Sequence, residues 1–500
     1  MEEIKNFFIA FILIFLVLVI WQYLFLPKPQ IEKPKEGKVK ESLPIDTLKT
    51  VKTKVDTIKE EIIVLENSKI RLTFSNLGGV LKSVYLKDYD CELLRPKSNY
   101  FGLTIFQEDK NYDLTWEIFK YEKKNNEIVF ETQSGKEKIT KRYKLKDDYQ
   151  LSFVLTGLAK GSYFSLNFDK FLNFTEKDTN EDLNYAHYQY YFKRNVKKFD
   201  FRKMKKDEFI YENEIDWLVM KNKYFLFALL PSFPFDSCQF LKREKEGGII
   251  IYSTNQDKSE LSLIFAPLEY NLLKGFKKDL EKAIPLGWPR SFSLAILFLL
   301  KFLYKIFQNY GVAIIFFALL MKLLFFPFSR MQNEQMRKLH LLQPKLEELK
   351  RKYKDDPQTL NRETMQLYQL YKINPFTGCL PLIIQLPVFW ALYSVFRQTI
   401  DLRKASFIFW LKDLSVKDPI YVLPIMMGIF FLLQNILTNP DKKNIFLTFI
   451  FPIFLTLIFL NFPSGLQLYW LTFNVLSIME SLIFQKGGLK WLKIKTKLNP

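Results

Sequence analysis

The sequence predicts a polytopic α-helical membrane protein that also carries an all-β sandwich domain. Residues 28–283 are polar and rich in lysine, whereas residues 284–485 are largely apolar, in a chain that has 50 phenylalanines among its 500 residues. The second half holds several uncharged runs close to the ~20 residues that a helix needs to cross a bilayer. The first half alternates polar and apolar residues in short runs, which is typical of strands. The chain therefore combines two structural classes.

The N-terminal residues are expected to form a transmembrane anchor followed by a flexible linker. Residues 7–27 carry no charge and contain Trp21 and Tyr23 near their end, as a span that stops at a membrane interface does. A cleaved signal peptide is the alternative, but its apolar core would be shorter, and no small-x-small cleavage site follows. We therefore assign residues 1–27 to the anchor and residues 28–57, rich in Lys, Glu and Pro, to the linker.

Residues 58–283 are predicted to form the β-sandwich. Period-2 alternation appears in runs such as EIIVLENSKIRLTFSN, YQLSFVLTG and GGIIIYST, separated by Gly, Asn, Asp and Ser turns. An aromatic run, NYAHYQYYFKR (184–194), either packs in a hairpin or lines a ligand groove. Cys91 and Cys238 either form a disulfide or are two separate buried thiols. The chain has three cysteines and two histidines without metal-ligand spacing, so we expect no metal site.

The second half is expected to begin with an amphipathic helix that lies in the membrane interface. Residues 284–308 contain Lys301 and Lys305 on one stripe of an otherwise apolar pattern, although a short span is the alternative. Residues 309–485 are then expected to form a core of five transmembrane helices, which makes six with the anchor. The predicted spans are 309–328, ending at Pro327, then 375–396, 419–437, 446–462 and 464–485.

Basic residues in the loops give the predicted orientation. If the N-terminus is cytoplasmic, the loops 329–374 and 438–445 and the tail 486–500 lie inside and carry 17 Lys and Arg. The outer loop 397–418 then carries 5. Since cytoplasmic loops are enriched in Lys and Arg, we place both termini in the cytoplasm and the β domain in the periplasm. The basic linker 28–57 runs against this bias, but long segments cross the membrane largely regardless of charge.

The cytoplasmic loop 329–374 is predicted to be a helical hairpin. Its first helix carries a coiled-coil seam, after which Asp356 and Pro357 mark a stop and a new helix start. The seam consists of Leu339, Leu342, Leu346, Leu349 and Tyr353. The basic surface of the hairpin is either a solvated face or a landing site for an acidic partner, a nascent chain or ribosomal RNA. The residues concerned are Arg337, Lys338, Lys350, Arg351 and Lys352.

Lys322 is the only charged residue between Gln308 and Ser329, inside the first predicted span of the core. A charge in a span costs about 2.5–3.5 kcal/mol on insertion scales and marks a functional site. Three interpretations stay open: the side chain reaches the cytoplasmic interface, pairs with Glu480 in the last span, or faces a water-filled cavity. Polar residues that could share such a cavity are Gln434, Asn435, Gln467 and Asn474.

Several segments of the second half resemble the YidC/Oxa/Alb family of membrane protein insertases. Two motifs of the family's spans are similar to INPFTGCLPLIIQLPVFWALY (373–393) and FPSGLQLYW (462–470). The family's cytoplasmic hairpin resembles LLQPKLEELKRKYKDDPQ (341–358), and the start of its fourth span resembles DLSVKDPIYVLPIMMG (413–428). The likeness covers roughly residues 285–485. Together with the anchor and the large β domain, it indicates the Gram-negative form of the family.

The resemblance implies a function. Proteins of this family insert other membrane proteins into the bacterial inner membrane, alone or with the Sec translocon, through a hydrophilic groove that opens to the cytoplasm and the lipid. The implied partners are nascent membrane proteins with short acidic translocated tails, the Sec translocon, a ribosome and membrane lipids. Such a protein is not an enzyme, needs no cofactor, and has no specific recognition of nucleic acid.

The resemblance also implies the residues of the groove. The family carries a positive residue, usually Arg, five positions before a proline of the first core span, and Lys322 holds that place before Pro327. Lysine keeps the charge but lacks the bidentate fork of arginine. Gln434 and Trp470 match groove-lining positions, and Tyr469 lies beside Trp470. The family's β domain resembles sugar-epimerase sandwiches, without an expectation of epimerase activity here.

Two other classes of function compete with insertion. A secondary transporter with Lys322 binding an anion would show inverted repeats and paired broken helices, and neither is detectable in the sequence. A membrane-anchored carbohydrate-active enzyme would need two close carboxylates in a sugar cleft of the β domain. The sequence has no G-x-x-x-x-G-K-[ST] loop, so nucleotide-driven transport is not expected.

Overall fold

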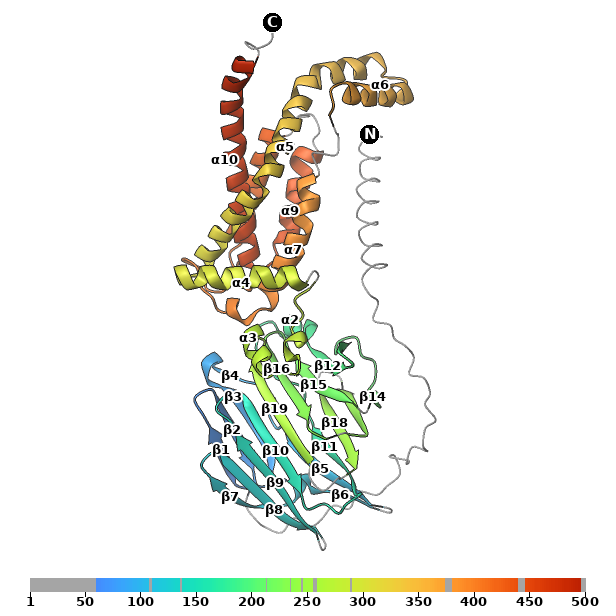
Figure 1. Ribbon diagram of the computed structural model, residues 1–500, viewed down its shortest axis with the longest axis vertical. Coiled ribbons are helices and arrows are strands. Elements are labelled where there is room, and N and C mark those ends of the chain that lie inside the picture. The colour runs from blue at the N-terminus through green and yellow to red at the C-terminus, as the bar shows by residue number, and fades with distance from the viewer. Residues whose placement is uncertain are drawn as a thin grey trace. The chain divides into compact units, whose positions relative to one another are not determined.

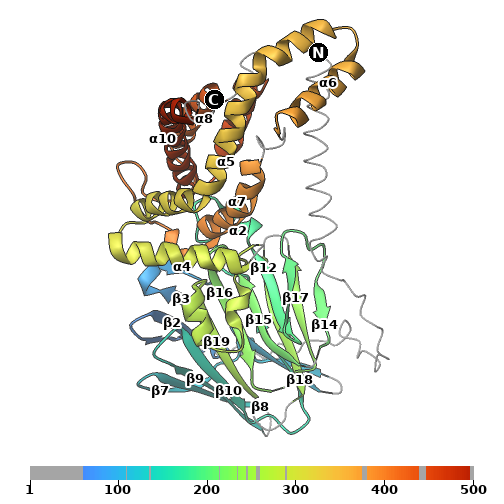
Figure 2. The ribbon, with the colours of Figure 1, turned by 45° about the horizontal axis from the view of Figure 1, so that its top comes forward.

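The chain divides into two compact units, one of strands that ends at Ile284 and one of helices that begins at Pro285. Figures 1 and 2 show the elements of each unit from two directions. The predicted anchor 1–27 and the predicted linker 28–57 lie outside the described residues, which begin at residue 60, so the count of six transmembrane helices is not confirmed. The computed structural model describes residues 60–107, 110–134, 137–212, 214–233, 235–243, 246–254, 259–287, 290–373, 380–438 and 446–495.

The β unit is a sandwich of two antiparallel sheets, as the alternating pattern predicts. The first sheet has 10 strands, of which β4 (Cys91–Glu92) pairs with β3 and β6 (Lys110–Asp113) pairs with β5 at its side. The others lie in the order β1 (Ile62–Glu66), β2 (Ile70–Ser75), β3 (Val80–Leu86), β5 (Tyr100–Gln107), β11 (Tyr163–Phe168), β18 (Glu246–Thr254), β17 (Ser237–Arg243) and β14 (Glu208–Ile210).

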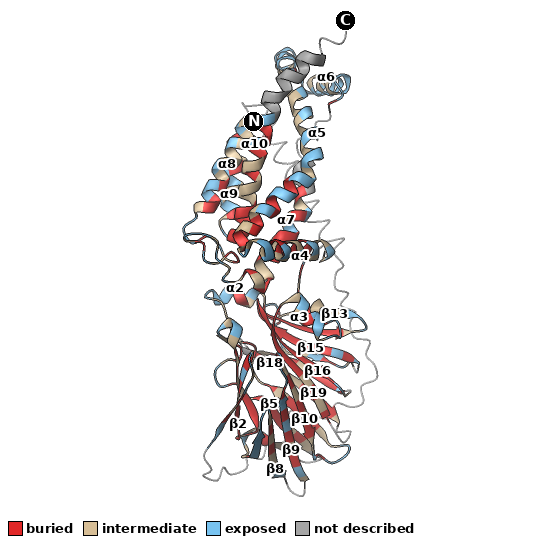
Figure 3. Ribbon diagram, turned by 60° about the vertical axis from the view of Figure 1, so that its left-hand side comes forward, coloured by how far each residue is buried: buried red, intermediate tan, exposed pale blue. Residues whose placement is uncertain are grey.

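The second sheet has 9 strands and includes the strands that are buried on both faces. Their order is β13 (Asn195–Asp200), β12 (His187–Phe192), β15 (Ile215–Lys221), β16 (Phe225–Pro231), β19 (Ser259–Pro267), β10 (Gln150–Thr156), β9 (Glu137–Leu145), β8 (Glu127–Ser134) and β7 (Lys120–Lys124). Every residue of β16 is buried, whereas β10 alternates between buried and half-buried residues along its length. Figure 3 shows this burial on the strands of the unit.

The core between the sheets is largely aromatic. The rings of Phe74, Phe101, Tyr143 and Phe153 form a connected cluster in which neighbouring centroids lie 4.6 to 5.1 Å apart. Aromatic pairs at this spacing stabilise a core by about 0.5–1.5 kcal/mol each beyond the area they bury. The alternation of such residues with polar ones along the strands therefore selects the face that each strand turns inward.

One lysine points into this aromatic core. Lys141 lies on the same face of β9 as the buried Tyr143 and Leu145, and it is 0% exposed. Its Nζ donates hydrogen bonds to the carbonyl oxygens of Gly78 and Phe101, each at 2.7 Å. Burial lowers the pKa of Lys141 to about 7, because the core disfavours the charged form. A neutral amine has two N–H donors, which the two carbonyl oxygens match.

The aromatic run 184–194 packs in the core, so the ligand-groove alternative is not needed to explain it. Its strand β12 forms a hairpin with β13. Tyr188 stacks on Phe240 with 4.7 Å between ring centroids, and Tyr191 stacks on Trp217 at 5.3 Å. The hairpin-packing interpretation of the run is confirmed.

The two cysteines of the β unit are not joined in a disulfide. Cys91 is half-buried and Cys238 is buried. Burial raises the pKa of Cys238, which keeps the thiol protonated. The second interpretation of this pair, two separate thiols, is therefore the one that the structure supports.

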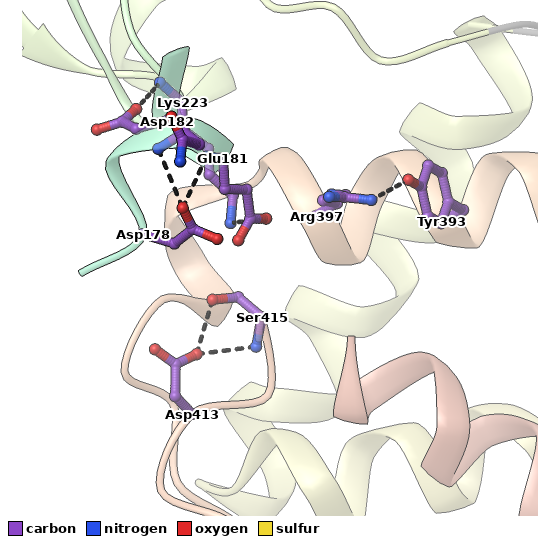
Figure 4. A network of polar contacts seen from close by, with 9 residues as sticks. Asp178, Glu181, Asp182, Lys223, Tyr393, Arg397, Asp413 and Ser415 are labelled. Atoms are coloured by element: carbon purple, nitrogen blue, oxygen red, sulfur yellow. Dashed lines mark hydrogen bonds and ion pairs between the residues drawn. The ribbon is translucent and has the colours of Figure 1, made fainter. Parts of the chain in front are cut away.

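A short helix, α2 (Thr179–Asn184), is fixed by the polar contacts that Figure 4 shows. The carboxylate of Asp178 caps the helix and accepts a hydrogen bond of 3.2 Å from the backbone N–H of Glu181. The buried Asp182 accepts one of 2.9 Å from the backbone N–H of Lys223, whose Nζ lies 3.0 Å from Glu181. These contacts tie α2 to the turn between β15 and β16.

The helical unit contains most of the elements predicted from residue 284 onwards. α10 packs against α5, α7 and α8. α5 and the segment Ser464–Ile483 are long and apolar enough to cross a membrane, and shorter apolar helices cover Val422–Leu437 and Thr448–Phe459. The elements are α4 (Arg290–Phe307), α5 (Tyr310–Lys352), α6 (Pro357–Leu370), α7 (Leu380–Gln398), α8 (Val422–Thr438), η6 (Phe446–Ile450), α9 (Phe451–Phe459) and α10 (Ser464–Lys495).

The helix that contains the first predicted core span does not end at Pro327. α5 continues through Pro327 and Pro344 to Lys352, so a single helix of 43 residues joins the span to the hairpin. A proline inside a helix removes one backbone hydrogen bond and often bends the helix without ending it. The helix of the last predicted span likewise continues beyond residue 485, because α10 runs into the predicted tail 486–500 as far as Lys495.

α4 has the amphipathic character that the sequence predicts. Its buried residues include Ile296 and Leu300, and the helix packs against α5 and α7. Lys301 does not share an exposed stripe with Lys305: its Nζ lies 3.1 Å from Oδ1 of Asp401, and both side chains are largely buried. Lys305 is exposed. The ion pair therefore attaches α4 to the loop that follows α7.

α5 and α6 form the predicted hairpin. Leu342 of the seam is buried, and α5 contacts α6. α6 begins with Pro357, and the carboxylate of Asp356 caps it by accepting a hydrogen bond of 3.1 Å from the backbone N–H of Thr359. The stop and restart predicted from Asp356 and Pro357 are confirmed.

Replacing Asp356 by alanine is expected to fray the first turn of α6, because the N–H of Thr359 loses its acceptor. Amide hydrogen exchange at Thr359 should become about threefold to tenfold faster. Asp355→Ala is the matched control, because Asp355 is an adjacent exposed acid that does not cap the helix. Equal acceleration by both substitutions would mean that net charge governs this turn and that capping does not.

Candidate functional site

α10 carries a stripe of polar residues through the apolar helical unit. Gln467, Trp470, Asn474, Ser477 and Ser481 follow one another at spacings of three and four residues, which places them on one face of the helix. Trp470 is half-buried and the other four are buried. The polar face of α10 therefore lies inside the helical unit.

Lys322 of α5 meets α10 at this stripe. Its Nζ lies 2.6 Å from Oε2 of Glu480 and donates a hydrogen bond of 2.8 Å to Oγ of Ser477. The ring centroid of Phe473 lies 4.9 Å from the same nitrogen. Lys322 and Glu480 are each 9% exposed. The structure thus shows the second of the three interpretations of Lys322, an ion pair with Glu480.

The partners of Lys322 come from successive turns of α10. Phe473, Ser477 and Glu480 are separated by four and three residues, so they share one side of the helix. The hydroxyl of Ser477 donates its own proton to the carbonyl oxygen of Phe473 at 2.8 Å, which leaves the oxygen free to accept from Lys322. Sequence analysis missed Ser477, although its place three residues before Glu480 could have indicated it.

Tyr469 and Trp470, the two aromatic residues assigned to the groove, make different contacts. The hydroxyl of the buried Tyr469 accepts a hydrogen bond of 2.8 Å from Nε2 of Gln385 on α7. Trp470 packs edge-on against Phe459 of α9, with 5.6 Å between centroids. Gln385 is a second polar residue that sequence analysis did not assign to the site.

The other predicted site residues fall in two places. Gln434 lies half-buried on α8, which packs against α10. The basic hairpin residues are remote from Lys322, since Lys350 follows it by 28 residues on one helix, about 42 Å along the axis. Arg337 is half-buried, and the exposed ones are Lys338, Lys350, Arg351 and Lys352.

Several polar atoms of the helical unit are buried without a hydrogen-bond partner among the described residues. Native proteins pair roughly 90% or more of such groups with protein atoms or ordered water. Four of these atoms belong to α10, which makes its polar stripe suited to hold water or the polar groups of a ligand. Among the unpartnered buried atoms are Nδ2 of Asn435, Oε1 of Gln467, Nε1 of Trp470, Nδ2 of Asn474 and Oε1 of Glu480.

Comparison with known proteins gives the family. A model of the 60Kd inner membrane protein family matches residues 302–490, and a model of the YidC periplasmic domain matches residues 62–300. The membrane protein insertase YidC of Syntrophus aciditrophicus is 32% identical over 474 residues, which cover 86% of each protein. This chain belongs to the YidC family of membrane protein insertases. YidC of Geotalea daltonii is 30% identical over 536 residues, with 97% of this chain and 99% of the relative covered.

Solved structures also show likeness to the chain. A crystal structure of an active YidC insertase with its first transmembrane domain resolved is 19% identical, with a TM-score of 0.41, and the match covers 87% of this chain and 94% of that one. YidC from Thermotoga maritima is 15% identical, with a TM-score of 0.32, and the match covers 84% of this chain and 99% of that one. A galactose mutarotase-like protein from Lactobacillus casei is 13% identical, has a TM-score of 0.32, and covers 41% of this chain and all of its own.

Membership of the YidC family confirms the resemblance found in the sequence. The chain is a membrane protein insertase of the inner membrane and not an enzyme. Its β unit corresponds to the periplasmic domain of the family. Its substrates as a class are nascent membrane proteins.

Proposed function

We propose that this YidC chain inserts its substrates through a hydrated groove formed by α5, α8 and α10, in which Lys322 is the positive group. The supporting observation is the set of buried, unpartnered polar atoms beside Lys322 and along α10. Such atoms cost free energy in a dry apolar bundle, so water that satisfies them would extend a polar path into the membrane. Gln434, Tyr469 and Trp470 are proposed to line this path.

The groove would lower the barrier that a translocated tail must cross. A carboxylate of a short acidic tail would be stabilised by the Lys322 ammonium and by water before it leaves the cytoplasmic half of the membrane. The hydrophobic segment would then move sideways into lipid, which supplies about 25 cal/mol for each Å² of apolar surface removed from water. The membrane potential would add about 2.3 kcal/mol per acidic charge per 100 mV. No covalent step is needed.

In this proposal both termini lie in the cytoplasm and the hairpin of α5 and α6 receives the substrate. The exposed side chains of Lys338, Lys350 and Lys352 support this role, since a basic surface attracts acidic partners such as a nascent chain or a ribosome. The Sec translocon is a further proposed partner. Exposed apolar side chains on α5, including Leu323 and Leu324, suit contact with membrane lipids.

Reconstitution into liposomes tests the proposed groove. A single-span substrate with an acidic tail is offered to vesicles that contain the wild type, Lys322→Arg or Lys322→Ala, and protease protection of the tail is measured. The wild type and Lys322→Arg should protect the tail. Lys322→Ala should slow insertion by about tenfold, which corresponds to about 1.4 kcal/mol of lost stabilisation.

Lys305→Ala is the matched control, because Lys305 is an exposed lysine of α4 outside the proposed groove. It should insert the substrate at the wild-type rate. Insertion by Lys322→Ala at that same rate would show that the charge of Lys322 is dispensable. No protection by wild-type vesicles, with or without added Sec translocon, would contradict the proposed function itself.

A further inference from the structure

The positive charge of Lys322 is already compensated within the chain. The 2.6 Å between its Nζ and Oε2 of Glu480 is the distance of a direct ion pair, and Ser477 takes a second N–H of the ammonium. An ammonium has three N–H donors, so two of them are engaged by α10. The site is therefore a neutral pair at rest and not a bare cation.

Glu480 competes with any carboxylate that approaches Lys322. It is fixed on α10 within contact distance, so its effective concentration at the ammonium is far higher than that of a carboxylate on a passing tail. Two carboxylates at one ammonium also repel each other, and burial strengthens that repulsion. An acidic tail must therefore displace Glu480 from Lys322 or share Lys322 with it.

The second carboxylate oxygen of Glu480, Oε1, adds a hydrogen-bond acceptor to the site. Glu480 is only 9% exposed, and its Oε1 atom is buried without a hydrogen-bond partner among the described residues. A carboxylate oxygen accepts from N–H and O–H groups. The pair thus presents an acceptor beside the donors of Lys322, which suits uncharged polar groups such as hydroxyls, side-chain amides and the backbone N–H of an extended segment.

We propose that Glu480 is a specificity-determining residue of the groove. It holds Lys322 as an internal carboxylate and so reduces the preference of this YidC chain for acidic over uncharged polar tails. Ser477 helps to position the ammonium of Lys322 beside Glu480, because its hydroxyl accepts a hydrogen bond from Nζ. The inference rests on the proposed function, because it concerns which tails pass through the groove that Lys322 occupies.

A pair of matched substrates tests this role. Both carry the same hydrophobic segment, and their short tails differ only in two residues, Asp in one and Asn in the other. The readout is the ratio of the two insertion rates, acidic over uncharged, in proteoliposomes. Glu480→Gln frees the charge of Lys322 and should raise this ratio by about fivefold, which corresponds to about 1 kcal/mol.

Glu334→Gln is the matched control, since Glu334 is an exposed carboxylate on α5 outside the groove, and it should leave the ratio at the wild-type value. An unchanged or lower ratio in Glu480→Gln, with the uncharged tail still inserted, would overturn the proposal and leave Glu480 a residue that only positions Lys322. If wild-type vesicles insert neither tail, the proposed function fails instead.

A second comparison covers the case in which Glu480→Gln does not fold. Lys322→Gln leaves the carboxylate of Glu480 without its cation, while Lys322→Gln/Glu480→Gln removes both charges. The acidic-to-uncharged ratio should be lower in Lys322→Gln than in the double variant, because only the first presents a carboxylate that repels an acidic tail. Equal ratios in the two variants would overturn the proposal.

Discussion

Replacing Lys322 alone by methionine is expected to destabilise the helical unit by about 3–5 kcal/mol, because it leaves the carboxylate of Glu480 buried without its partner. Glu480→Leu alone should destabilise it in the same way, because it leaves a buried ammonium. The double variant Lys322→Met/Glu480→Leu should recover most of the loss. Apolar side chains of similar volume often replace a buried ion pair with little change in stability.

Equilibrium unfolding of the full chain in mixed detergent micelles measures the free energies of this double-mutant cycle. The matched control is the pair Arg330 and Glu334 on α5, whose Nε and Oε1 atoms lie 3.4 Å apart and whose side chains are exposed. Exposed pairs at this spacing contribute about 0.3–0.5 kcal/mol, so their cycle should show little coupling. Strictly additive losses at Lys322 and Glu480 would contradict a buried ion pair.

The features that the sequence predicts correctly depend on neighbouring residues. Alternation along β9 and β10 decides which face of each strand turns inward, so the sandwich follows from short segments. The restart of the hairpin at Asp356 follows from one capping side chain and the proline after it. The resemblance to insertases rests on four short segments, two of which are motifs of the predicted spans. Each of these signals is complete within about 20 residues.

The partner of Lys322 depends on tertiary packing, which no local pattern fixes. Lys322 and Ser477 are 155 positions apart, and the rotation of α5 about its own axis decides whether they meet. The sequence therefore identified Glu480 as the candidate acidic partner of Lys322. It could not decide whether Lys322 reaches the cytoplasmic interface, pairs with Glu480 or faces a water-filled cavity. The continuation of the helix through Pro327 was not foreseen for a related reason, because packing around α5 decides whether a proline ends the helix or is accommodated.

Buried lysines of the β unit are a second feature that depends on packing. Lys141 stands on the inward face of β9, so the alternation of that strand indicates its burial. The two carbonyl oxygens that receive its Nζ belong to distant parts of the chain, at Gly78 and Phe101. Local patterning thus identifies the position, while the hydrogen-bond partners that make burial tolerable come from the assembled sandwich.

The stability of the β unit is expected to rise with pH between about 7 and 9, and Lys141→Met should remove a large part of that rise. Burial lowers the pKa of Lys141 to about 7 in the folded state, whereas an unfolded lysine titrates near 10.5. Between these values the unfolded chain binds more protons than the folded one, so raising the pH favours folding. Below about pH 7 both states are protonated, and the contribution no longer changes.

Each such lysine contributes at most about 1.4 kcal/mol of stability per pH unit in this window. Lys221, whose pKa burial also lowers to about 7, adds a contribution of the same sign. The difference between the wild type and Lys141→Met in this pH dependence therefore isolates Lys141, and it should amount to about 2 kcal/mol between pH 7 and 9, because the folded-state amine is already half deprotonated at pH 7. Pulse proteolysis of the full chain in urea, followed at the β unit, measures it at pH 7, 8 and 9.

The slope separates the titration of Lys141 from its hydrogen bonds. Lys141→Met also leaves the carbonyl oxygens of Gly78 and Phe101 without this donor, which lowers stability at every pH but leaves the slope unaffected. Lys144→Met is the matched control, because Lys144 is an exposed lysine on the same strand, and it should keep the wild-type slope. A Lys141→Met protein with the full wild-type slope would mean that the buried amine stays charged across this range and that its two carbonyl partners stabilise the ammonium form.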